Sequence, residues 1–99
     1  MSADNCNDST KTFSPGKICA TPGALAVLEK AAIEPASLLR RHLSGDWGDL
    51  DDHDKAVNRQ GIELGLRVMS SYSIHTGEKV WIITEADRSV TTILLPEEY

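Results

Sequence analysis

The hydrophobic positions follow two different spacings along the chain. In the first half, apolar residues recur three or four positions apart, as on one face of a helix. Leu25, Leu28 and Ala32 share such a face, which predicts a helix over residues 22–33. A hydroxyl residue followed by proline, at Thr21, is a typical helix start.

Two more helices follow by the same reasoning. Pro35 begins the second, which is predicted over residues 35–43, and Gly45 is placed to follow its end in a left-handed conformation. Asp51 can cap the third helix through its carboxylate, and Gly65 is placed to end it.

The second half alternates between apolar and polar residues, which is typical of strands. Three strands are predicted, joined by a glycine-containing loop over residues 75–78 and by a polar turn over residues 85–89; they span residues 66–74, 79–84 and 90–95. Helices in one run and strands in another predict an α+β fold. We expect about three N-terminal helices on one face of a three-stranded antiparallel C-terminal meander.

The start of the chain differs from the rest. Residues 1–12 are polar and offer little to bury, so they are predicted to be a disordered tail. Residues 13–99 are then one α+β domain. Within it, residues 13–20 are predicted to be an ordered lead-in to the first helix, with a turn at Pro15-Gly16 and Ile18 touching the core.

Composition narrows the class of protein. The chain has 99 residues, is 40% hydrophobic and 25% charged, and carries a net charge of −5. These values suit a soluble globular domain and argue against non-specific nucleic-acid binding, which favours a basic face, although a local basic patch stays open. No apolar run approaches a membrane span, and no export signal is recognised, so we expect a cytoplasmic location without membrane contact.

The two cysteines give little chemistry. Cys6 and Cys19 lack the spacing and the neighbouring histidines of a zinc site, and free thiols in a reducing cytosol are expected rather than a disulfide. No metal and no cofactor are predicted. Five aspartates cluster before and within the start of the third helix, but without the register of a calcium loop, and helix capping and surface solvation explain them; they are Asp46, Asp49, Asp51, Asp52 and Asp54.

The last predicted turn carries the densest set of functional groups. An acid, a guanidinium and several hydroxyls come together there, in Thr84, Glu85, Asp87, Arg88, Ser89, Thr91 and Thr92. Such groups can bind a phosphate or another anion. The same residues also suit a surface ion pair flanked by threonines that favour strands, and the sequence leaves both interpretations open.

A second candidate lies around the end of the second helix. Arg40, Arg41 and His42 can form a small anion site with His42 as a proton carrier, although cations at that end also suit the helix dipole. Trp47 stands in a glycine-flanked loop beside Asp46. It is either a lid over the core or an exposed platform for stacking.

Three phrases of the chain resemble a family of small bacterial proteins encoded on plasmids and integrated elements. They are Phe13-Ser-Pro-Gly-Lys-Ile-Cys-Ala-Thr-Pro-Gly-Ala24, Arg41-His-Leu-Ser-Gly-Asp-Trp-Gly48 and the segment from Trp81 to Tyr99. Members are often labelled plasmid-related protein or type I restriction endonuclease subunit M. A methyltransferase needs a cofactor domain and an Asn/Asp-Pro-Pro-aromatic motif, and neither fits in this chain. The phrases contain the candidate residues His42, Asp46 and Trp47 and those of the last turn.

Two functions follow as hypotheses. The first is a non-enzymatic binding module of a mobile element, which contacts a protein partner or a small anionic ligand. The second is a metal-independent ribonuclease of the small toxin type. In that case His42 is the general acid or base, Glu85 or Asp87 its partner, and Arg88 the residue that stabilises charge on the phosphorus.

Overall fold

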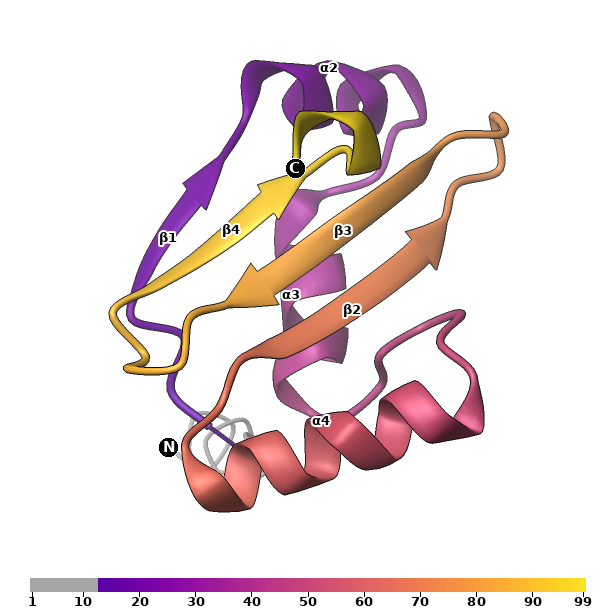
Figure 1. Cartoon of the computed structure of the whole chain (residues 1–99). Helices are drawn as coiled ribbons and strands as arrows, with labels where there is room; N and C mark the ends of the chain where they lie inside the picture. Colours follow the sequence, from indigo (N-terminus) through magenta and orange to yellow (C-terminus); the bar gives the residue numbers. More distant parts are fainter. Residues whose placement is uncertain (1–12) are drawn as a thin grey trace, which may run out of the picture.

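A computed structural model describes residues 13–99 of the chain. The elements follow one another as β1 (Lys17–Ala20), α2 (Pro22–Lys30), α3 (Pro35–Leu43), α4 (Asp52–Leu64), β2 (Val68–Ser73), β3 (Lys79–Thr84), β4 (Val90–Leu94) and the short 3-10 helix η1 (Pro96–Glu98). The fold is α+β, and the four strands form one sheet in the order β1-β4-β3-β2 (Figure 1). The predicted tail and Cys6 lie outside the described residues.

The predicted three-stranded antiparallel meander was wrong. The lead-in contributes a fourth strand, β1, which pairs parallel to β4, with Ile18 beside Thr91 and Ala20 beside Ile93. The helices therefore lie in the middle of the chain, between β1 and the other strands. This short strand has no clear alternation of its own, and its place is set by pairing with residues more than seventy positions away. Ile18 was expected to touch the core, but 43% of its surface is exposed.

Local signals placed most helix ends correctly. The Thr21 hydroxyl accepts a hydrogen bond from the Ala24 amide (3.1 Å), and the Asp51 carboxylate accepts one from the Asp54 amide (2.8 Å). Gly65 ends α4 in the left-handed conformation, as expected. The first helix, however, stops at Lys30 rather than at residue 33, because Ala32 takes a positive φ of 59° that turns the chain away from the helix axis.

The main core lies between the sheet and the first two helices. Figure 1 shows α3 behind the strands and α2 beyond their upper end, leaving the opposite face of the strands without an α-helix. Alternate strand residues point inward, and they pack with residues of both helices; the buried apolar cluster contains Ala24, Leu28, Ala31, Leu38, Tyr72, Ile74, Val80, Ile82, Ile93 and Leu95.

The helix α4 is held in a different way. It lies beside the edge strand β2, and the only side chains or glycines that it buries are Asn58 and Gly61. The Asn58 amide group bonds both backbone groups of Met69, donating to its carbonyl (2.6 Å) and accepting from its N–H (3.1 Å). A polar side chain thus closes the sheet edge where another strand would pair, and α4 is anchored by hydrogen bonds rather than by apolar packing.

Among the described residues, no helix has the length and apolar character needed to cross a membrane.

Candidate functional site

A buried chain of hydrogen bonds connects α3 to three strands. The His42 ring bonds the Ser70 hydroxyl through Nδ1 (2.5 Å) and the Thr84 hydroxyl through Nε2 (2.9 Å). Thr84 in turn bonds the Thr91 hydroxyl (2.7 Å), which donates to the carbonyl of Pro15 (2.7 Å). All four side chains are fully buried. Each of β2, β3 and β4 thus contributes one polar residue of this chain to an otherwise apolar inward face.

The direction of each proton in this chain follows from its last bond. Thr91 uses its only hydrogen on the Pro15 carbonyl, so its oxygen must accept from Thr84. Thr84 then has no hydrogen left for the imidazole and accepts from Nε2–H of His42. In the neutral imidazole, Nδ1 then carries no proton and accepts from the Ser70 hydroxyl, so both ring nitrogens are satisfied.

Burial has a second effect on His42. It lowers the pKa of the imidazole from 6.5 to about 4, because the charged form loses its hydration in the interior. The ring of Phe13 packs edge-on against His42, with 5.2 Å between ring centroids. A ring that has no exposed surface and is neutral at pH 7 does not meet the requirements for the proton carrier proposed from the sequence.

Arg88 is close to the same cluster but faces other groups. Its guanidinium lies 5.4 Å from the centre of the Phe13 ring and donates to the carbonyls of Leu66 (2.6 Å), Gly61 (3.0 Å) and Glu85 (3.1 Å). Its backbone has a positive φ of 61°, which the turn requires. These bonds tie the β3–β4 turn to the end of α4. The N–H donors of Arg88 that could bind an anion are thus engaged with backbone carbonyls.

The other residues of the predicted turn site do not lie together: some are exposed to solvent, and others lie on one or the other face of the sheet. The Asp87 carboxylate accepts from the Ser89 amide (3.0 Å), and its hydrogen bonds with Ser89 lower the pKa of Asp87. Glu85, Asp87 and Ser89 are exposed, whereas Thr92 is half-buried on the opposite sheet face from Thr91. The structure therefore does not gather the predicted set around one point.

Arg41 and Asp46 form an exposed pair at the end of α3. The Arg41 guanidinium donates to the Asp46 carboxylate (2.7 Å), and this bond raises the pKa of Arg41 and lowers that of Asp46. The guanidinium also lies 4.6 Å from the centre of the Tyr72 ring, and the Tyr72 hydroxyl donates to the Asp46 carbonyl (2.7 Å). Together these contacts hold the loop that contains Trp47 against β2.

Trp47 is the buried lid that was one of the two sequence interpretations. Only 5% of its surface is exposed, and its backbone carbonyl accepts from the Ser71 amide (3.1 Å) at the edge of the sheet. The neighbouring Gly48 packs so tightly on β2 that an added Cβ would stand 2.1 Å from the Ser71 carbonyl oxygen. The indole Nε1–H, however, is buried without a hydrogen-bond partner among the described residues.

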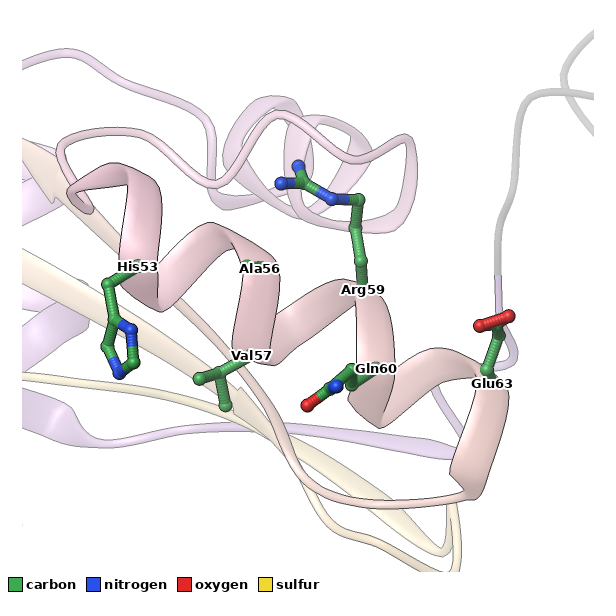
Figure 2. Close-up of a pocket in the computed structure, with 6 residues that line it drawn as sticks. All are labelled: His53, Ala56, Val57, Arg59, Gln60 and Glu63. Carbon is green, nitrogen blue, oxygen red and sulfur yellow. The ribbon is translucent and has the colours of Figure 1, made fainter.

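Several depressions in the accessible surface lie around α4. One depression follows the helix itself, and Figure 2 shows His53, Val57 and Gln60 projecting to one side of α4 while Arg59 projects to the opposite side. On the Val57 side, a groove runs between α4 and β2, and it is lined by Leu50, Asp54, Val57, Asn58, Arg67 and Met69. On the Arg59 side, a further depression is lined by Gly45, Trp47, Arg59, Ile62 and Glu63.

A third depression continues the groove onto the sheet face that has no helix. It shares Leu50, Asp54 and Met69 with the groove and adds further residues of the loop and strands, namely Asp49, Asp51, Ser71, Lys79, Trp81 and Pro96. The C-terminal Tyr99 packs edge-on against Trp81, at 5.9 Å between ring centroids. Arg67 donates a hydrogen bond to the Tyr99 hydroxyl.

The sequence interpretation missed the residues that shape these surfaces. Ser70 completes the buried network, and its signal was a polar residue at an inward position of an apolar strand. Val57 and Leu64 lie seven residues apart on α4, and their exposure of 46% and 69% depends on how this helix packs. Within residues 13–99, no group of three or more potential metal ligands is close enough to hold an ion.

Comparison with known proteins finds no match: no protein-family model, no curated protein and no solved structure matches this chain.

Proposed function

We propose that this protein is a small non-enzymatic binding module that contacts a protein partner, and, from its sequence resemblance, that it serves a bacterial mobile element. One observation supports the proposal above the others. Apolar surface extends from α4 through the groove at Leu50 and Met69 to Trp81 on the sheet face without a helix. We call this continuous area the α4–sheet surface.

The seating of α4 explains why this area is exposed. A helix that belongs only to a core buries its apolar stripe. Here α4 is anchored by Asn58 and Gly61, while Val57 and Leu64, seven residues apart on one stripe, are left 46% and 69% exposed. Leu66, just beyond the helix, is 50% exposed. Of these residues, Val57 lines the groove, and apolar surface left exposed in this way is typical of protein interaction sites.

The charges around the α4–sheet surface indicate the type of partner. Three carboxylates line this surface against two cations, Lys79 and Arg67; the carboxylates are those of Asp49, Asp51 and Asp54. An acidic rim of this kind repels the phosphates of nucleic acids and attracts basic protein surfaces. We therefore propose a partner with an apolar contact area and basic groups at its edge.

The ribonuclease alternative gains no support from the geometry. It needs an accessible imidazole and a free guanidinium in one cleft, but His42 is fully buried and Arg88 donates to backbone carbonyls.

The test compares two charge-introducing variants at equally exposed apolar positions. Val57→Glu lies in the α4–sheet surface, whereas Leu25→Glu lies on α2, with 46% and 45% of the wild-type side chains exposed. Figure 1 shows α2 at the opposite end of the molecule from α4, which carries Val57. A partner retained by the wild-type protein from a bacterial lysate is purified, and its affinity for each variant is measured by titration calorimetry at two salt concentrations.

We expect Val57→Glu to weaken the complex by about tenfold or more, as charge at the centre of an apolar contact does, and Leu25→Glu to leave the affinity nearly unchanged. Higher salt should also weaken wild-type binding, because the rim is charged. Equal affinities for the two variants would refute the proposed surface. Multiple-turnover cleavage of RNA by the purified wild-type protein would refute a purely binding function.

A further inference from the structure

One residue that lines the depression between the 45–47 loop and α4 carries an unused hydrogen-bond donor. Trp47 lines it together with Gly45 and the α4 residues Arg59, Ile62 and Glu63. The Trp47 indole is 95% buried, yet its Nε1–H bonds no described residue. A buried donor without an acceptor is costly, and proteins rarely keep one without a use.

The other lining groups define what would satisfy this donor. Ile62 and the indole ring supply an apolar wall. Arg59 is exposed and makes no ion pair with any described residue, so its guanidinium is available for an acceptor. Figure 2 shows the Arg59 side chain extending away from the Val57 side of α4, so this site and the α4–sheet surface lie on different flanks. Glu63 adds one carboxylate at the edge.

From this combination we propose that the Trp47–Arg59 depression binds a monocarboxylate with an apolar body. The body packs against Trp47 and Ile62, and the carboxylate accepts from the indole N–H and the Arg59 guanidinium. The depression has a volume of about 500 Å³, within the range of small-molecule sites. The indole N–H is covered in this structure, so the Trp47 side chain must turn outward for the acceptor to reach it.

The chain provides an internal control for a direct test. It contains two tryptophans, so its ¹H–¹⁵N spectrum has two indole N–H signals. Trp81 lies on the sheet face without a helix and should not respond to a ligand at Trp47. Benzoate is the probe, and benzamide is its neutral analogue. Trp47→Phe identifies the Trp47 signal by its loss.

We expect benzoate to shift the Trp47 indole signal downfield and saturably while the Trp81 signal stays in place. Benzamide should bind about tenfold more weakly, because it lacks the charge-assisted bond to Arg59. Arg59→Gln should remove this preference, whereas Arg40→Gln, an exposed residue with the same charge change, should keep it. Glu63→Gln should strengthen benzoate binding, since it removes a like charge from the edge.

Three results would overturn the proposal. The first is no saturable shift of the Trp47 signal at millimolar benzoate. The second is a parallel shift of both indole signals, which marks non-specific contact. The third is an undiminished preference for benzoate in Arg59→Gln. None of these results bears on the Val57 and Leu25 comparison, so the two proposals succeed or fail separately.

Discussion

Acidification should destabilise this protein through one residue, His42. Its pKa is lowered from 6.5 to about 4 in the folded state. Between these two values, the unfolded chain binds a proton at His42 that the folded chain does not. The free energy of unfolding therefore falls as the pH falls from about 6.5 to about 4, and the contribution of the neutral imidazole is fully present only above that window.

The size of the effect follows from the same two values. A difference between 6.5 and about 4, at about 1.4 kcal/mol per pH unit, corresponds to at most about 3–4 kcal/mol. Between pH 7 and pH 5 we expect a loss of about 2 kcal/mol. The carboxylates of Asp46, Asp87 and Glu98 have lowered pKa values, so their stabilising contributions are lost only at lower pH.

Urea unfolding followed by tryptophan fluorescence measures this quantity at pH 7, 6 and 5. The control is His42→Gln, because its amide group can still donate towards Thr84 and accept from Ser70 but does not titrate. The wild-type protein should lose about 2 kcal/mol more than the variant over this range. A histidine ring titration by NMR on the wild-type protein gives the same pKa independently, which covers the case of a variant that does not fold.

Parallel stability profiles for the two proteins would refute the reasoning, as would an NMR midpoint for His42 near 6.5. Either result would mean that water reaches the ring and that the network from Ser70 to Thr91 is not closed in solution.

Three further predictions concern stability, each measured by urea unfolding at pH 7. Thr84→Val should lower the free energy of unfolding by about 1–3 kcal/mol, because it leaves the imidazole N–H of His42 unpaired. The control Thr92→Val lies on the opposite sheet face and should change stability by less than about 0.5 kcal/mol. Similar losses in the two variants would contradict the network. Asn58→Ala should cost about 1–3 kcal/mol by exposing the β2 edge, and a neutral result would show that α4 is not anchored there. Gly48→Ala should cost clearly more than Gly77→Ala, because both glycines have positive φ but only Gly48 has backbone within contact of an added Cβ; equal costs would rule out the close packing on β2.

Several features could be predicted from local sequence. The Thr21-Pro22 start, the Asp51 cap and the left-handed Gly65 each depend on neighbours a few residues away, so the chain specifies them without its tertiary structure. The strands β2, β3 and β4 were predicted to within two residues at each end, since alternation of apolar and polar residues reflects one buried face.

The candidate site shows the limit of that reasoning. From the sequence, His42, Thr84 and Thr91 were candidate functional residues because they are polar. A polar side chain, however, can either take part in a reaction or form a hydrogen bond with another buried polar group. Only the packed structure shows that the three bond one another in the interior. Arg88 was likewise a plausible anion ligand until the carbonyls around it were placed.

The sequence by itself determined the helix starts and the three long strands, because these depend on contacts within a few positions or on a repeating pattern. Tertiary structure alone decided that residues 17–20 join the sheet parallel to β4, that His42 is buried and neutral, and that α4 leaves its apolar stripe exposed. Each of these features depends on contacts between residues that are far apart in the sequence. The local spacing of residues does not specify which distant residues make those contacts.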